Sequence, residues 1–350
     1  MARILIATRG SFGDFQPFLA IADQLSSRGH TLVFVTNQHN VESVRKRGFE
    51  THAFDAPQSA AHKPTAPDAP RHETDTYART VDGSGKGTWR VLSRLTQYLE
   101  AEFEVIARLA PSCDVLVGSY TSLALPLVTR SLKRTWVYAP LAPMAFLSRF
   151  DPPYLHGIHH LRVGGMLPAW LSQCIFAIFR YSAGLHVLGH RRLERRLGLP
   201  ALNPVFEGRY SPVCNLALFS PLMGTPQPDW PANTVQCGFT LYEPAGSETD
   251  AGGLAEFMAA GPAPVVFTVG GVARADPGDF YRHAIAACTA LGLRAVLVKK
   301  SSLDLGMLPP GIVAVNYASH AWLFPRARWR LCTTAALARL PKCCCTASLR

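Results

Sequence analysis

Uninterrupted apolar segments of membrane-spanning length are absent from these 350 residues. The longest apolar stretch, 163–179, contains proline, serine and glutamine and falls short of the roughly 20 clean residues that a span needs. We also expect no signal peptide, because Met1-Ala2-Arg3 leads directly into an apolar run of strand length. We therefore expect a cytoplasmic protein, with peripheral contact at the inner membrane surface as an alternative.

Charged residues are scarce, at 17% of the chain, although basic residues exceed acidic ones enough to give a net charge of +11. The basic residues are dispersed, and their one dense run, 191–196, has no interleaved aromatic residues and accompanies no nucleic-acid motif. The sequence thus gives no support for a nucleic-acid partner. We expect a solvated helix face at this run, with attraction to anionic lipid headgroups as the minority alternative.

Cysteine pairs with the C-x-x-C spacing of a zinc site are lacking too. Of nine cysteines, Cys113, Cys174, Cys214, Cys237 and Cys288 are scattered through apolar segments, as in a reduced cytosolic protein. The other four lie within the last 19 residues, three of them adjacent. We expect neither a metal site nor a disulfide framework.

The chain is rich in apolar residues, at 48%, and its length predicts two globular domains. Apolar segments of strand length alternate with amphipathic segments of helix length, which predicts an α/β protein with doubly wound parallel sheets. The expected strands are 3–8, 31–36, 49–54, 114–118, 136–139, 213–219, 264–269, 294–298 and 311–315. The expected helices are 15–27, 41–47, 89–109, 123–132 and 280–291, with a broken helical region at 150–197. Residues 57–87 are expected to form a long loop, and residues 243–253 an interdomain linker.

The turn after the first strand, Gly10-Ser11-Phe12-Gly13-Asp14, is the first candidate site. Two glycines allow a tight turn and the close approach of a ligand, and Asp14 would lie at the carboxyl end of the sheet. From the residues alone, Asp14 is as readily a helix N-cap as a catalytic group. The turn is not a dinucleotide fingerprint, because a third glycine and an acidic residue ending the second strand are both missing.

Three segments together resemble one group of glycosyltransferases, which contains the sterol glucosyltransferases, glycolipid rhamnosyltransferases and antibiotic glycosyltransferases. The first is the opening turn, continued by Pro17 and an apolar helix. The second comprises Phe-Ser-Pro at 219–221, Pro-Asp-Trp-Pro at 228–231 and Cys-Gly-Phe at 237–239. The third is Pro-Val-Val-Phe-Thr-Val-Gly-Gly at 264–271. The N-terminal domain of this group is glycosyltransferase family 28, and the resemblance covers residues 1 to about 328.

The resemblance implies a GT-B architecture of two Rossmann-like doubly wound domains, the second incomplete. The implied divisions are an acceptor-binding domain at 1–240, a linker at 241–256, a partial donor domain at 257–328 and an aberrant tail at 329–350. It implies inverting transfer from a nucleotide diphosphate sugar to a lipid or other hydrophobic hydroxyl, with Asp14 as general base. The implied donor-binding residues are Ser11, Gly13, Gly270, Gly271 and Tyr317. No cofactor or metal is implied beyond the sugar nucleotide, since glycine-rich turns and helix N-termini suit its phosphates.

Structural alternatives remain open for two of these assignments. The glycine pair Gly270-Gly271 is alternatively a simple strand-to-helix turn. Tyr317, which would stack on the nucleotide base, is alternatively a packing residue at a strand end.

The tail departs from the family pattern, because the donor-binding His-His-Gly-Gly-x-Gly-Thr segment does not follow Ala327. Some of the codons that can encode residues 332–349 would encode that motif if they were read in a shifted frame. We therefore expect a frameshift close to Arg328 and a truncated donor domain. The chain is then expected to be weak or inactive. A non-catalytic acceptor-binding remnant is the main alternative, and a nicotinamide-dependent oxidoreductase is disfavoured by the incomplete fingerprint.

Overall fold

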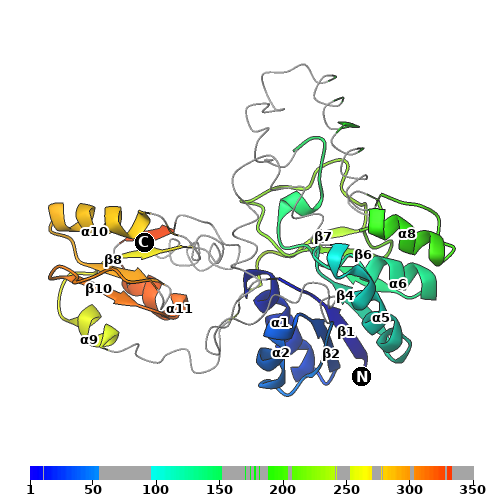
Figure 1. Ribbon diagram of the computed structural model, residues 1–350, viewed down its shortest axis with the longest axis horizontal. Helices are drawn as coiled ribbons and strands as arrows, with labels where there is room; N and C mark the ends of the chain where they lie inside the picture. The colour runs from blue at the N-terminus through cyan, green and yellow to red at the C-terminus, as the bar shows by residue number, and fades with distance from the viewer. Residues whose placement is uncertain are drawn as a thin grey trace. The chain divides into compact units, whose positions relative to one another are not determined.

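The computed structural model describes residues 1–10, 12–54, 96–151, 188–203, 207–240, 253–269, 279–299, 303–327 and 329–332, with single residues between them at 170, 174, 177, 178, 181, 242 and 277. The chain forms two compact units, Met1–Thr240 and Leu241–Arg350. Each unit is built on its own parallel sheet (Figure 1). The two units are therefore described one at a time.

The first unit contains a sheet of seven parallel strands in the order β3-β2-β1-β4-β5-β6-β7. Its strands are β1 (Arg3–Ala7), β2 (Thr31–Thr36), β3 (Glu50–Ala53), β4 (Val115–Gly118), β5 (Trp136–Tyr138), β6 (Cys214–Ala217) and β7 (Thr234–Gln236). Its helices are α1 (Phe12–Ser27), α2 (Gln38–Arg45), α5 (Leu99–Leu109), α6 (Leu125–Leu132) and α8 (Leu188–Arg196), with 3-10 turns at Ala110–Ser112 and Pro143–Ala145. The strand order reverses direction between β1 and β4, and such a switch point is where open α/β sheets bind ligands.

The apolar pattern explains the central elements of this unit. The last four residues of β1 are buried, as expected for a parallel strand covered on both faces. In α1 the helical spacing of Phe15, Phe18, Leu19 and Ala22 directs one buried stripe toward the sheet. The helix is followed by Gly29, whose positive φ of 85° reverses the chain into β2.

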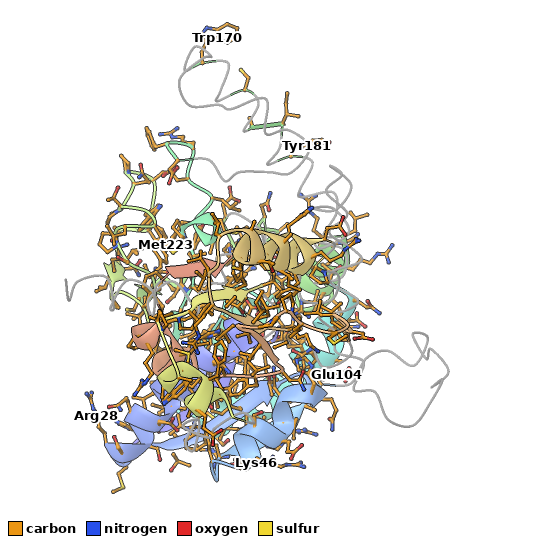
Figure 2. The ribbon with its side chains drawn as sticks, turned by 90° about the vertical axis from the view of Figure 1, so that its left-hand side faces the viewer. Arg28, Lys46, Glu104, Trp170, Tyr181 and Met223 are labelled. Carbon is orange, nitrogen blue, oxygen red and sulfur yellow. The ribbon has the colours of Figure 1, made fainter. Side chains whose placement is uncertain are left out.

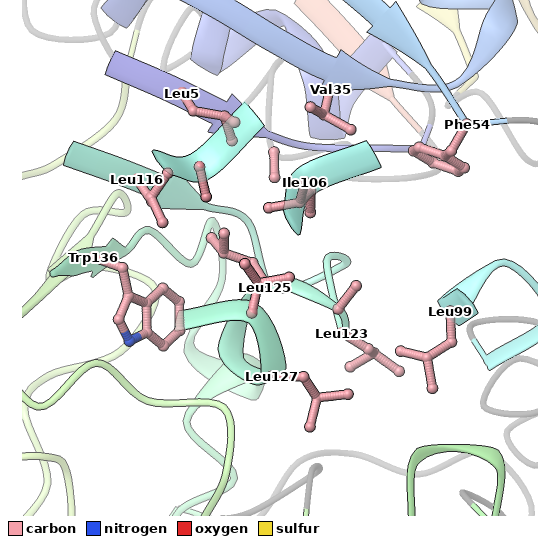
Figure 3. Packing of buried hydrophobic residues seen from close by; sticks show 14 of the residues in the cluster. Leu5, Val35, Phe54, Leu99, Ile106, Leu116, Leu123, Leu125, Leu127 and Trp136 are labelled. Carbon is pink, nitrogen blue, oxygen red and sulfur yellow. The ribbon is translucent and has the colours of Figure 1, made fainter. Parts of the chain in front are cut away.

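A large apolar cluster of the described residues lies between the sheet and two helices (Figure 3). Leu5, Val35 and Leu116 contribute from three neighbouring strands, while Ile106 of α5 and Leu125 of α6 cover them. Burying each such side chain stabilises the fold by about 1.5–3 kcal/mol. This packing holds the carboxyl ends of β1 and β4 together as one rigid edge.

The second unit contains four parallel strands in the order β10-β9-β8-β11. They are β8 (Val265–Thr268), β9 (Ala295–Val298), β10 (Ile312–Val315) and β11 (Trp329–Cys332). Helix α10 (Phe280–Ala290) packs on one face, while α9 (Leu254–Ala259) and α11 (His320–Leu323), which is followed by a 3-10 turn at Phe324–Arg326, pack on the other. Alternate residues of β8 enter the two cores, since Phe267 packs with α10 and Val266 with α9 and α11.

Several expected boundaries differ from the structure. Helix α1 begins at Phe12, three residues earlier than expected, and α2 spans Gln38–Arg45 instead of 41–47. Strand β7 was not predicted, because its three residues carry no long apolar run, and it forms by pairing with β6. Helix α9 begins at Leu254, within 241–256, the linker that the family resemblance implies. The expected loop at 57–87 and most of the helical region at 150–197 lie outside the described residues.

No strand or helix was assigned to the tail at 329–350, which was expected to be aberrant. Residues Trp329–Cys332 instead form β11, which pairs in parallel with β8, Trp329 opposite Val265 and Cys332 opposite Thr268. The segment is short and carries Arg330 between apolar residues, so its strand character comes from pairing with a neighbour already in place.

Among the described helices, none has the length and apolar character needed to cross a membrane.

Candidate active site

Asp14 lies in the first turn of α1, at the carboxyl edge of the first sheet, and its side chain is half-buried. Because the helix begins at Phe12, Asp14 is inside it and does not occupy the N-cap position. The interpretation of Asp14 as an N-cap is therefore wrong. A negative charge in a first helical turn is still favourable, because the backbone N–H groups there are exposed.

Gly10 accommodates the carboxylate of Asp14. A Cβ atom placed on Gly10 would lie 2.7 Å from Asp14 Oδ2 and 3.0 Å from both Cβ and Cγ of the same side chain. Gly10 also has a φ of 117°, which side-chain-bearing residues rarely adopt. The carboxylate thus lies against the Cα atom of Gly10, where no other residue type leaves room for it.

Tyr120 reaches the same carboxylate from the neighbouring strand. Its phenol donates a hydrogen bond to Asp14 Oδ1 at 2.5 Å. Tyr120 is the second residue after β4, whereas Asp14 follows β1, so this bond joins the two sides of the switch point. Tyr120 was not among the predicted site residues. The available signal was its place just beyond a predicted strand of a parallel sheet.

The turn at Gly10 is further held by polar groups from α2, from the residue before it, and from the segment after β4. Asn37 Oδ1 accepts a hydrogen bond from the Gly10 N–H at 3.0 Å, and His39 Nε2 lies 3.1 Å from the Gly10 carbonyl oxygen. The hydroxyl of Thr121 donates to the Arg9 carbonyl at 2.9 Å. These contacts hold the turn between its neighbours, so the carboxylate of Asp14 is presented from a fixed backbone.

A buried carboxyl group lies close to this turn. Glu102 is 1% exposed and accepts a 2.5 Å hydrogen bond from the Ser122 hydroxyl. Burial raises the pKa of Glu102, while the positive charge of Arg9 and the bond from Ser122 act in the opposite direction. Arg9 itself is 4% exposed and lies over the Tyr98 ring at 5.6 Å. A buried carboxyl group with a shifted pKa is common at functional sites, and the charge of Arg9, a residue of the turn, acts directly on Glu102.

Of the other predicted site residues, one lies in the first unit, one in the second, and three outside the described residues. Gly13 is half-buried in the first turn of α1, next to Asp14. Tyr317 belongs to the second unit, follows β10 by two residues and is 53% exposed. Ser11, Gly270 and Gly271 lie outside the described residues.

Lys299 is a second residue that sequence reasoning missed. It directly follows β9, and its backbone N–H donates to the Val315 carbonyl at the end of β10. Lys299 and Tyr317 thus lie at the carboxyl edge of the second sheet, one strand apart. In the part of the chain that the structure describes, no group of three or more histidine, cysteine, aspartate or glutamate side chains could hold a metal ion.

Comparison with known proteins relates the chain to sugar-transferring enzymes. Residues 4–137 match the glycosyltransferase family 28 N-terminal domain. The chain is 26% identical to the O-mycaminosyltylonolide 6-deoxyallosyltransferase of Streptomyces fradiae, over 93% of this chain and 74% of that protein. It is 23% identical to the sterol 3-beta-glucosyltransferase of Emericella nidulans, over 92% of this chain but only 23% of that protein.

Solved structures agree with this relationship at the level of the fold. The spinosyn rhamnosyltransferase superimposes with a TM-score of 0.61 at 15% identity, covering 98% of this chain and 77% of that one. A Streptomyces sp. SF2575 glycosyltransferase complexed with thymidine diphosphate gives 0.54 at 16% identity, over 98% and 80%. The expected α/β class and GT-B fold are confirmed.

Proposed function

We propose that this glycosyltransferase, whose residues 4–137 form a family 28 N-terminal domain, transfers a hexose or deoxyhexose from a nucleotide diphosphate sugar to a hydroxyl of a lipid or other hydrophobic acceptor. The donor is of the UDP-glucose or dTDP-rhamnose type, and the anomeric configuration is inverted. The observation that carries the proposal is the half-buried carboxylate of Asp14, held at the switch point by Gly10 and Tyr120.

The chemistry assigned to Asp14 is general base catalysis. The acceptor hydroxyl loses its proton to the carboxylate while its oxygen forms a bond to the anomeric carbon. The bond from that carbon to the phosphate oxygen breaks, and its electron pair leaves with the nucleoside diphosphate. A single displacement of this kind inverts the configuration at the anomeric carbon.

Donor recognition is assigned to the carboxyl edge of the second sheet, with contributions from the opening turn. We assign Tyr317 to stacking on the base, and Ser11, Gly13, Gly270 and Gly271 to backbone contacts with the donor. Lys299 adds a positive charge suited to phosphate oxygens. These groups require no metal or other cofactor, and the thymidine diphosphate complex of a structural neighbour supports a nucleotide diphosphate as ligand.

A non-catalytic acceptor-binding protein is the second candidate function. It is favoured by one observation, the absence of a His-His-Gly-Gly-x-Gly-Thr segment from the 350 residues. For the same reason we expect any transfer by this chain to be slow. The proposal also includes a cytoplasmic location, with peripheral contact at a membrane surface. The membrane contact is supported by four exposed arginines on α8, at 191, 192, 195 and 196.

The test is product formation by the full chain with UDP-glucose or dTDP-rhamnose and a panel of hydrophobic acceptors, including a sterol and O-mycaminosyltylonolide, followed by mass spectrometry. We expect slow transfer that falls by about two to four powers of ten in Asp14→Asn, which keeps the size of the side chain but removes its basicity. Asp23→Asn, in the same helix, is the control. Acceptor binding without transfer from either donor would establish the non-catalytic alternative.

A further inference from the structure

We infer that Tyr120 positions the Asp14 carboxylate, holding Oδ1 through its phenol while the carboxylate receives the acceptor proton. This inference rests on the proposed function. Tyr120 acts here as a positioning residue, since its phenol contacts Asp14 and is assigned no contact with the substrate.

The backbone on both sides of Tyr120 is tied to the β1 turn. The Ser119 N–H donates to the Ala7 carbonyl at 3.0 Å, and the Thr121 hydroxyl donates to the Arg9 carbonyl at 2.9 Å. The carbonyl of Tyr120 itself accepts a hydrogen bond from Arg209 Nη2 at 3.3 Å. Tyr120 therefore projects from an anchored segment, and its phenol has a defined position relative to Asp14.

The two carboxylate oxygens of Asp14 have different surroundings. Oδ1 accepts the 2.5 Å bond from the phenol, which is short as expected for a hydroxyl donating to a charged acceptor. Oδ2 lies beside the Cα atom of Gly10, a position that a side chain would fill. The bond to Oδ1 restricts the rotation of the carboxylate about its Cβ–Cγ bond.

The proton balance follows from this arrangement. As the acceptor oxygen bonds to the anomeric carbon, its proton moves to the Asp14 carboxylate, and the nucleoside diphosphate departs with the electron pair of the broken bond. The phenol of Tyr120 keeps its own proton throughout, as a donor to Oδ1. Removing the phenol hydroxyl leaves the base in place but frees its rotation, so the rate falls while acceptor binding is retained.

The test compares Tyr120→Phe, Asp14→Asn and the double variant in the full chain. We expect Tyr120→Phe to lower kcat by about 10- to 100-fold, the scale of a misplaced catalytic group, with the acceptor KM changed less than about twofold. In the Asp14→Asn background, Tyr120→Phe should cause no further loss. Tyr210→Phe is the matched control, because Tyr210 is also half-buried in the first unit and its phenol donates a 2.6 Å bond to the Phe146 carbonyl, away from Asp14.

Each other result has a definite meaning. An unchanged kcat in Tyr120→Phe, or an equal additional loss in the Asp14→Asn background, overturns the positioning role. If Tyr120→Phe weakens acceptor binding and also lowers the urea concentration at which the protein unfolds, the positioning role is overturned in favour of a structural role. A wild-type chain that transfers no sugar overturns the proposed function itself, whereas a transferring wild type with an indifferent Tyr120→Phe overturns only the present inference.

Discussion

Gly10 and Asp14 share one tight space, because a Cβ on Gly10 would lie 2.7 Å from Oδ2 of Asp14. The turn glycine is therefore required by the carboxylate as well as by its own backbone conformation. Even a methyl group at residue 10 would therefore displace the carboxylate of the proposed base.

Gly10→Ala is expected to lower transfer by about 100-fold, because the added methyl group displaces the carboxylate. The positive φ adds about 1–2 kcal/mol of backbone strain. Gly48→Ala is the matched control, since Gly48 also has a positive φ of 77° but a Cβ there would meet nothing within 4 Å. Urea unfolding and transfer rates of both variants separate the two effects. Equal rates in the two variants would show that the methyl group leaves Asp14 undisturbed.

His190 makes the first unit sensitive to acid. Its side chain is 1% exposed, and burial together with the charge of Arg130 lowers its pKa to about 4, against 6.5 in an unfolded chain. Between pH 6.5 and 4 the unfolded state therefore binds more protons, so the free energy of unfolding falls as the pH falls through that window. The fall attributable to His190 reaches about 3 kcal/mol at its lower end.

Urea unfolding between pH 7 and pH 4 measures this dependence. His190→Gln removes the titrating group and should flatten the profile over the window. His283→Gln, on the exposed surface of α10, should leave the profile unchanged. A profile as steep in His190→Gln as in the wild type would assign the acid sensitivity to other groups.

Donor binding by the chain is expected to be weaker than micromolar, because phosphate recognition commonly uses a helix N-terminus of the kind supplied by the absent glycine-rich motif. Calorimetry with UDP-glucose and dTDP-rhamnose tests this. Lys299→Met should weaken the remaining binding further, whereas Lys46→Met, which removes an exposed charge from the first unit (Figure 2), should not. Micromolar binding by the wild type would show that Gly270, Gly271 and Tyr317 suffice.

Trp230 anchors the exit from the first unit and explains the Pro-Asp-Trp-Pro segment. Its ring stacks on Phe146 with centroids 4.3 Å apart and meets Phe219 edge to face at 5.8 Å. Trp230→Ala should lower the free energy of unfolding by about 3–5 kcal/mol. Trp170→Ala is the control, because Trp170 is 66% exposed and its side chain extends outward in Figure 2. Equal losses in the urea midpoint would contradict the anchoring role.

Limited proteolysis should cut the chain between the two units, within the segment 243–253, which contains three glycines. The first unit has seven strands and its own core, so a resistant fragment ending in that segment is expected. The smaller second unit, with four strands, should be digested sooner. Equal resistance on both sides of the segment would show that the second unit is as stable as the first.

The sequence by itself determined the parallel α/β class, most of the strands and the location of Asp14, because these features follow from short apolar runs and the turn glycines beside them. Tertiary structure alone decided three others. Strands β7 and β11 exist because neighbours pair with them. The start of α1 at Phe12 placed Asp14 inside the helix. The bond from Tyr120 to Asp14 joins residues 106 positions apart. Their meeting depends on the parallel register that ends β1 and β4 at one edge, and no local pattern encodes that register.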